Sequence, residues 1–231
     1  MVRQINRAAS GGAIDRGQII RFTFDGKQYE GFSGDTLASA LLANGVRLYG
    51  RSFKYHRPRG LVAAGPEEPN ALVTMRSGAR REPNIPATLV EIYEGLVAES
   101  QNRWPSLALD LMGVNNLLSP IFVAGFYYKT FMWPASFWEP VYEKLIRRAA
   151  GMGIAPDQPD PDRYERAHAF CDVLVIGGGP AGIQAAREAG EAGERVLLVE
   201  QMPWLGGSIE KPKTDADTLA EMGNVTVMTR T

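Results

Sequence analysis

Cysteine is almost absent from this sequence. Its 231 residues include a single cysteine, Cys171, so no disulfide can form within the chain. Disulfides persist in oxidising compartments, and their absence favours a reducing one. We therefore expect a cytoplasmic location. We also expect Cys171, which precedes an apolar run, to pack as a small apolar side chain and not to react.

An excess of charge of either sign is also missing. The chain has 25 basic and 26 acidic residues and a formal net charge of −1, so its overall field attracts neither nucleic acid nor an anionic membrane. The most apolar stretch, residues 117–138, is interrupted by Pro120, Lys129 and Pro134 and is too broken to span a bilayer. We expect no nucleic acid and no membrane among the partners.

The first part of the chain is predicted to form a β-grasp module. Residues 1–16 have no apolar segment typical of a secretory signal and are expected to form a flexible arm. Residues 19–32 alternate apolar and polar side chains around Asp25-Gly26, a dipeptide favoured in hairpin turns. A further strand and turn at residues 71–78 indicate that the module covers residues 17–85.

A helix is predicted directly after the hairpin. Ser33 or Asp35 can provide its N-cap, and Gly45 ends it. Its apolar side chains share one helix face. They are Leu37, Ala40, Leu41 and Ala43.

Residues 86–155 are predicted to form a helical connector rich in aromatic side chains. Helical patterns run through residues 88–100 and 139–151, and in the second of them Val141, Leu145 and Ala149 repeat at helical spacing. The aromatic side chains either pack against another subunit or domain, belong to an ordinary core, or contact a cofactor. They are Phe126, Tyr127, Tyr128, Phe131, Trp133, Phe137 and Trp138.

A second domain is predicted after a linker over residues 156–168, whose prolines and aspartates stop helices and central strands. Residues 171–176 are an apolar, β-branched run typical of a parallel strand buried on both faces. A glycine loop and a helical pattern follow. Gly177 permits the tight turn, Gly179 leaves room for a pyrophosphate, and Gly182 lets helix and strand approach each other.

An acidic residue completes the pattern of a dinucleotide site. A second apolar run, residues 195–199, ends at Glu200, whose carboxylate can accept hydrogen bonds from a ribose diol and would repel a 2′-phosphate. NAD or FAD is therefore favoured over NADP. Gly206 and Gly207 follow, and this pair resembles the glycine pair of the flavoproteins with two dinucleotide-binding domains. A helix-capping turn is the alternative.

The chain therefore combines α/β and α+β elements. A helix within residues 214–223 and a strand at 225–229 would complete only the first half of a Rossmann-type domain over residues 169–231. We accordingly expect the chain to be the N-terminal piece of a longer polypeptide. The predicted cofactor-binding residues are Gly177, Gly178, Gly179, Pro180, Ala181, Gly182, Glu200, Gln201, Gly206, Gly207 and Ser208.

Neither a catalytic residue nor a metal site is predicted in this chain. No nucleophile–base arrangement and no paired carboxylates are apparent, and neither His56 nor His168 has another histidine at ligand spacing. A β-grasp module before such a nucleotide domain resembles fused proteins that carry a 2Fe–2S ferredoxin-like domain. Such a cluster needs about four thiolates. Residues 61–73, where those cysteines would stand, contain none, so we expect a ferredoxin-like module without a cluster.

Several long and unusual motifs point to one family. They are residues 34–60, which include RSFKYHRPRG, then GPEEPNALV, SQNRWPSL, LLSP, AGFYYKTFMWP and VIGGGPAG. Together they cover nearly the whole chain. On these motifs the sequence resembles the alpha subunits of heterotetrameric sarcosine oxidases.

The resemblance implies an oxidoreductase subunit. The complete enzyme of that family oxidatively demethylates sarcosine to glycine with formaldehyde or 5,10-methylenetetrahydrofolate and hydrogen peroxide. It implies beta, gamma and delta subunits as partners, with FAD on the beta subunit, FMN between alpha and beta, and a NAD without a role in turnover on the glycine loop of this chain. The rest of the nucleotide domain and a folate-binding domain would follow in the complete alpha subunit.

Two alternatives are kept. A related opine or cyanide-forming amino acid dehydrogenase subunit is one, although the missing cysteines speak against it, because those relatives use a cluster for electron transfer. The other is a non-catalytic assembly module whose glycine loop has lost its ligand.

A basic cluster could also contact a nucleotide phosphate or a partner, or could be a solvated loop with local ion pairs. It comprises Arg47, Arg51, Lys54, His56, Arg57 and Arg59.

Overall fold

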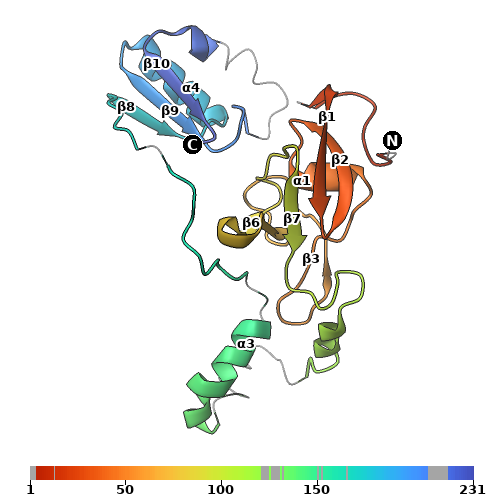
Figure 1. The fold of residues 1–231 in the computed structure, drawn as a ribbon. Helices are drawn as coiled ribbons and strands as arrows, with labels where there is room; N and C mark the ends of the chain where they lie inside the picture. The colour runs from red at the N-terminus through yellow and green to blue at the C-terminus, as the bar shows by residue number, and fades with distance from the viewer. Residues whose placement is uncertain are drawn as a thin grey trace. The chain divides into compact units, whose positions relative to one another are not determined.

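The chain forms two compact units, Met1–Asp162 and Arg163–Thr231, and the break between them falls inside the stretch expected to be a linker (Figure 1). The computed structural model describes residues 4–12, 14–120, 125, 131, 133–149, 151, 153–164, 166–207 and 218–231.

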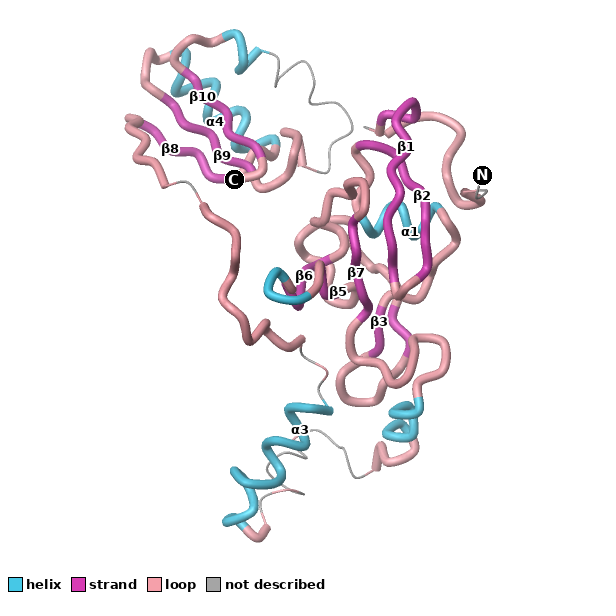
Figure 2. The backbone as a smooth tube through the Cα atoms, in the orientation of Figure 1, coloured by secondary structure: helices cyan, strands magenta, loops and turns pink. Residues whose placement is uncertain are grey.

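A five-stranded sheet forms the centre of the first unit. Its order is β2-β1-β7-β5-β6, with β1 antiparallel to β2 and parallel to β7 (Figure 2). A helix, α1 (Leu37–Ala43), packs on this sheet. A hairpin, a crossing helix and a later strand parallel to the first constitute the predicted β-grasp fold, which is confirmed. The strands are β1 (Asp15–Phe24), β2 (Lys27–Ser33), β5 (Leu72–Met75), β6 (Glu82–Pro86) and β7 (Leu96–Ser100).

The hairpin turn is the one that the sequence predicts. Asp25 and Gly26 have φ angles of 48° and 75°, and positive φ at both central residues is what a two-residue hairpin turn with the twist of its strands requires. The Asp25 carboxylate also accepts from the backbone and the hydroxyl of Ser100, at 2.8 and 2.7 Å. The turn is therefore joined to the end of β7.

The N-cap of α1 is Thr36, so the prediction of Ser33 or Asp35 was wrong. The Thr36 hydroxyl accepts from the Ser39 backbone N–H, and the Ser39 hydroxyl accepts from that of Thr36. This reciprocal pair satisfies two N–H groups that a helix start leaves free. Asp35 is buried and pairs with Arg7 instead of capping the helix. Gly45 follows the end of the helix with φ 85°, as expected.

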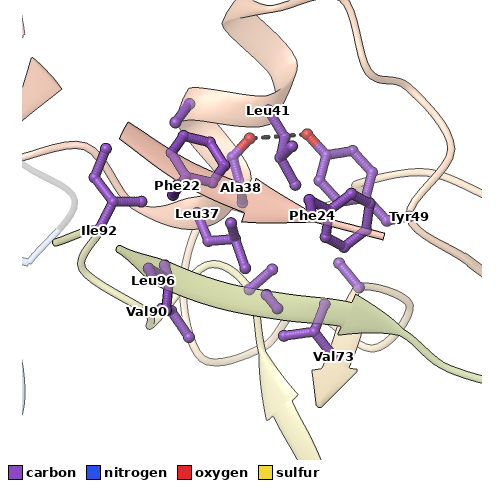
Figure 3. Close-up of a cluster of buried hydrophobic side chains, with 14 of the residues drawn as sticks. Phe22, Phe24, Leu37, Ala38, Leu41, Tyr49, Val73, Val90, Ile92 and Leu96 are labelled. Carbon is purple, nitrogen blue, oxygen red and sulfur yellow. Dashed lines mark hydrogen bonds between the residues drawn. The ribbon is translucent and has the colours of Figure 1, made fainter. Parts of the chain in front are cut away.

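The core lies between α1 and the sheet (Figure 3). Phe22 and Phe24 of β1 meet Leu37 and Leu41 of α1 in this cluster. Tyr49, fully buried beside them, donates its hydroxyl to the Ala38 carbonyl at 2.8 Å. Burial raises the pKa of Tyr49 above its ordinary value, and the nearby Glu68 charge adds to this. The ring therefore stays neutral, and its hydroxyl fixes the helix relative to the sheet.

Residues 88–100 do not form the helix that their spacing suggests. Gly95 turns the chain with φ 80° and donates to the Arg21 carbonyl at 2.9 Å, and β7 then pairs with both β1 and β5. Residue 85 itself lies within β6, so the sheet continues beyond the expected end of the module. Pairing between strands far apart in sequence outweighs the local helical pattern.

Part of the segment that was expected to be a flexible arm contacts the module, through residues 4–7. The Asn6 backbone donates to the Ala43 carbonyl at 3.2 Å. Arg7 forms a bidentate ion pair with Asp35, at 3.1 and 2.6 Å. Because Asp35 is only 1% exposed, its charge needs this partner, and the pair holds the segment against the module.

Short elements complete the first unit. Val141 and Leu145, predicted on a helix face, lie on helical turns and are 38% and 60% exposed. Trp133 and Phe137 are also exposed, so they are not core residues of this unit; the aromatic residues 126–128 lie outside the described ones. The elements are β3 (Gly50–Arg51), β4 (Pro58–Arg59), η1 (Gly78–Arg80), η2 (Leu111–Asn116), η3 (Ala135–Phe137), η4 (Trp138–Tyr142) and α3 (Glu143–Ala149).

The second unit contains a parallel sheet of order β10-β9-β8. Its elements are β8 (Val173–Ile176), α4 (Pro180–Glu191), β9 (Val196–Glu200) and β10 (Val225–Thr229). They follow the predicted order of strand, loop, helix and strand, and a helical turn at 218–221 precedes β10. Ile183 and Ala186 of α4 are buried in the small core of this unit.

Strand β8 is exposed on one face, which corrects the expectation that both faces are buried. Leu174 and Ile176 are 53% and 80% exposed, whereas Val173 and Val175 pack against the core that contains α4. The sheet is thus covered on the side of α4 within the described residues. Cys171 is half-buried just before the strand.

Candidate dinucleotide site

The glycine loop joins β8 to the first turn of α4. Gly177 has φ 98°, a left-handed conformation that favours glycine, and its backbone N–H donates to the Val199 carbonyl of β9 at 2.8 Å. A Cβ atom on Gly182 would lie 1.9 Å from the Gly177 carbonyl oxygen. The close approach predicted for Gly182 is therefore present, and it brings the helix start next to the strand end.

Among the residues that the structure describes, none fills the space beside Gly179. It is the N-cap of α4, with φ −73° and no side-chain hydrogen bond, and an added Cβ would meet no atom of those residues within 4 Å. Pro180 and Ala181 form the exposed first turn. The backbone N–H groups at the start of a helix lack partners within the helix and attract anions. Within the described residues, the geometry thus leaves the start of α4 open to an approaching ligand.

Glu200 lies at the loop, at the end of β9. Its carboxylate accepts from the Gly178 backbone N–H at 2.6 Å and from the Met202 N–H at 2.8 Å. A carboxylate has roughly four lone-pair sites, so hydrogen-bonding capacity remains for a ligand hydroxyl. Gln201 is exposed beside it.

The glycine pair after Glu200 packs against the same loop. The Gly206 backbone donates to the Gly178 carbonyl at 2.6 Å, and a Cβ on Gly207 would lie 3.7 Å from the Gly179 Cα. Within residues 201–207 the structure has no helix that this pair could end. Ser208 lies outside the described residues.

An ion pair that we did not predict supports the opposite end of the sheet. The Arg195 guanidinium donates to both carboxylate oxygens of Asp172, at 2.8 and 2.9 Å, and its backbone N–H donates at 3.0 Å. These hydrogen bonds lower the pKa of Asp172 to about 2. Opposite charges just before two parallel strands are the signal in the sequence that indicates such a pair.

The basic cluster of the first unit is largely used within that unit. Arg51 donates to the carbonyls of His56 and Leu107, and the buried His56 ring lies 2.7 Å from the Asp110 carboxylate through Nδ1. Arg57 donates to Asn116 and lies over the Tyr55 ring. These contacts favour the interpretation of local ion pairs and hydrogen bonds. Arg47 and Arg59 are exposed.

Neither a metal site nor a membrane-spanning helix is found in the part of the chain that the structure describes. Those residues contain no group of three or more histidine, cysteine, aspartate or glutamate side chains placed to hold a metal ion. Among the helices of the same residues, none has the length and apolar character needed to cross a bilayer.

Two family models match separate parts of the chain. Residues 17–103 match a 2Fe–2S iron-sulfur cluster binding domain, and residues 172–212 match an FAD dependent oxidoreductase. The first match covers the sheet through β7, and the second covers the glycine loop and Glu200.

Three curated proteins illustrate what this chain is similar to. The sarcosine oxidase alpha subunit of Rhizobium meliloti (strain 1021) is 56% identical over 95% of this chain and 24% of that protein. The sarcosine oxidase alpha subunit of Corynebacterium sp. (strain U-96) is 36% identical over 90% of this chain and 17% of that protein. An opine oxidase subunit of Agrobacterium tumefaciens (strain Ach5) is 49% identical over 20% of this chain and 9% of its own. The chain thus spans a quarter or less of the length of these relatives.

Proposed function

This chain is a relative of the sarcosine oxidase alpha subunits over 95% of its length, and from this premise we propose that it is the nucleotide-binding portion of such a subunit. Its ligand in this proposal is NAD, held between the start of α4 and the end of β9. Its other contribution is to the assembly of the enzyme complex.

The open helix start at Gly179 is the observation that carries this proposal. A pyrophosphate beside Gly179 would meet the free N–H groups of the first turn of α4, where the helix dipole also favours negative charge. Gly178 and Gly182 are required by the packing of the loop itself, because an added Cβ would collide with Leu205 or with Gly177. Gly179 is under no such constraint, so its lack of a side chain suits a ligand.

Glu200 selects the class of dinucleotide. With its carboxylate anchored by two backbone N–H groups, it can accept from the two hydroxyls of an adenosine ribose, whereas a 2′-phosphate would be repelled. NAD and FAD share this adenosine diphosphate half. The match of residues 172–212 to an FAD dependent oxidoreductase favours FAD as the second candidate for the same site.

The reaction belongs to the complete enzyme. In our proposal it oxidatively demethylates sarcosine to glycine, with formaldehyde or 5,10-methylenetetrahydrofolate and hydrogen peroxide as the other products, on FAD and FMN. The beta, gamma and delta subunits are the proposed partners, in the cytoplasm, and this chain alone is inactive. The opine-type alternative is weaker, because that relative is similar over 20% of this chain while the sarcosine oxidase relative is similar over 95%.

Identification of the bound nucleotide tests this proposal. The purified chain is incubated with NAD and FAD together, freed of unbound nucleotide by gel filtration and denatured, and the released molecules are identified by mass. Release of NAD in a ratio near one per chain is the expected result. If FAD is released instead, FAD and not NAD is the ligand of this site. If neither nucleotide is released, the alternative of an assembly module without a ligand is favoured.

A further inference from the structure

A buried glutamate holds the loop that follows β4 in the first unit. Glu68 accepts the backbone N–H groups of Val62 and Ala63 with one carboxylate oxygen, at 2.7 and 2.8 Å. Its other oxygen accepts the N–H of Asn70 at 2.7 Å. The residue is 3% exposed. The loop at 61–71 therefore wraps around a single carboxylate.

The charge of Glu68 is balanced by these peptide groups. Among the residues that the structure describes, neither a lysine nor an arginine forms an ion pair with it. Burial by itself raises the pKa of Glu68, but the hydrogen bonds from Ala63, Val62, Asn70 and Ala71 outweigh burial and leave the pKa below its ordinary value. Several backbone N–H groups pointing at one place make an anion-binding concavity, a device also used around iron–sulfur clusters.

This concavity lies within the part of the chain that matches a cluster-binding domain. Residues 17–103 match a 2Fe–2S iron-sulfur cluster binding domain, yet that range contains no cysteine, and the single cysteine of the chain is Cys171. A cluster needs about four thiolates, so the residues present do not fit it. The N–H groups of Val62, Ala63 and Asn70 point instead at a carboxylate of the chain itself.

We propose that Glu68 is an internal anion that organises the loop at 61–71 in place of an iron–sulfur cluster. The loop keeps inward-facing backbone N–H groups, and a side chain supplies the negative charge that they require. The module is thereby ordered without iron. A residue outside the loop also contacts it, because the Thr88 hydroxyl donates to the Gly65 carbonyl at 2.8 Å.

Glu68→Gln in the 231-residue chain is the main test, with Glu67→Gln as the matched control. Both remove one carboxylate from the same loop, but Glu67 is exposed. A glutamine amide at position 68 presents its NH2 group to at least one backbone N–H, which is then buried without an acceptor. Amide hydrogen exchange of peptides spanning 61–71 is expected to become roughly tenfold faster or more in E68Q and to stay unchanged in E67Q. Equal exchange in both variants would overturn the proposal.

Acidification of the unmutated chain tests the same proposal if E68Q does not fold. Because the pKa of Glu68 is lowered in the folded chain, its contribution to stability is present above the unfolded pKa of about 4.3 and is lost as the pH falls through the folded value. The titratable neighbours are Tyr49, which stays neutral at acid pH, and Glu67, which E67Q removes. Protection of 61–71 should decline below about pH 4 in the wild type and in E67Q. Protection that is the same at acid and neutral pH would contradict the role of Glu68.

Reconstitution with ferrous iron and sulfide under reducing conditions tests the replacement of the cluster. The wild-type chain should retain neither iron nor acid-labile sulfide after gel filtration. A stoichiometric cluster on the chain would show that the loop still accepts the cofactor, and the proposal would be wrong. None of these tests depends on nucleotide binding by the second unit.

Discussion

Asp172 and Arg195 show how a single residue pair can fix the start of two strands. The guanidinium and the backbone N–H of Arg195 lower the pKa of Asp172 to about 2. Because this folded value lies below the ordinary value of about 3.9, the contribution of the pair is present above pH ~4 and is lost as the pH falls toward ~2. Both side chains are exposed, so water screens the pair and its effect on stability is small.

An NMR titration of the Asp172 carboxyl carbon measures this directly. We predict a midpoint near 2, and a midpoint shifted toward about 3.9 in Arg195→Gln, which removes the guanidinium donors. Arg163→Gln, at the start of the same unit, is the control and should leave the titration unchanged. A midpoint unaffected by Arg195→Gln would show that the pair does not form in solution.

Gly182 is the residue on which the approach of α4 to β8 depends. A Cβ atom there would lie 1.9 Å from a backbone oxygen, which cannot rotate away as a side chain can. We predict that Gly182→Ala destabilises the second unit by about 1–3 kcal/mol, as overpacking does. Urea unfolding followed by a probe in this unit is the measurement.

The control for this prediction is Gly223→Ala. Gly223 belongs to the same unit, and a Cβ there would meet none of the described residues within 4 Å, so the unfolding free energy of Gly223→Ala should differ from that of the wild type by less than about 0.5 kcal/mol. If both variants unfold alike, the close contact between Gly182 and Gly177 is not present in solution.

At the scale of elements, the N-terminal segment and α1 are joined through a buried charge. Arg7→Gln leaves Asp35, which is 1% exposed, without its cation. We predict a loss of about 3–5 kcal/mol from the unfolding free energy of the first unit, the usual cost of breaking a buried pair. Arg16→Gln, which removes an exposed arginine that donates to backbone carbonyls, should cost far less. Similar losses in chemical denaturation would contradict the anchoring of this segment.

The elements that the sequence predicts correctly are those with local signals. The turn at Asp25-Gly26 and the helix after it are encoded within a few residues, as are the strand, glycine loop and helix around Gly177. The segment at 88–100 was misread because its apolar spacing fits a helix, while its actual structure depends on pairing with β1 and β5. Secondary structure that rests on distant partners is not visible in a local pattern.

The same distinction applies to the candidate sites. Gly177, Gly179, Gly182 and Glu200 follow a known spacing, and the structure brings them together. Contacts between distant segments follow no fixed spacing in the sequence. Examples are the contact of Arg7 with Asp35 and that of His56 with Asp110. Glu68 belongs to the motif GPEEPNALV. That its carboxylate accepts hydrogen bonds from the backbone of its own loop is visible only in the structure.

At the scale of the whole molecule, the two compact units have separate cores. The proposed nucleotide contacts all lie in the second unit. We predict that NAD slows amide exchange in peptides from β8 through Gly207 and leaves peptides of Met1–Asp162 unchanged, because a ligand stabilises the unit that binds it. Hydrogen exchange with and without NAD is the measurement. Protection confined to the first unit would move the site to a different place.

Calorimetric titration of NAD, and separately of FAD, into the wild-type chain, Gly179→Ala and Gly223→Ala tests the central claim most directly. A methyl group at position 179 meets none of the described residues within 4 Å, so G179A should keep the unfolding free energy of the wild type, yet the methyl group would occupy the space of the pyrophosphate. We predict binding by the wild type and G223A, and affinity at least about tenfold weaker in G179A. Equal affinity in all three, or no binding by the wild type to NAD or to FAD, would contradict the assignment of the glycine loop as a dinucleotide site.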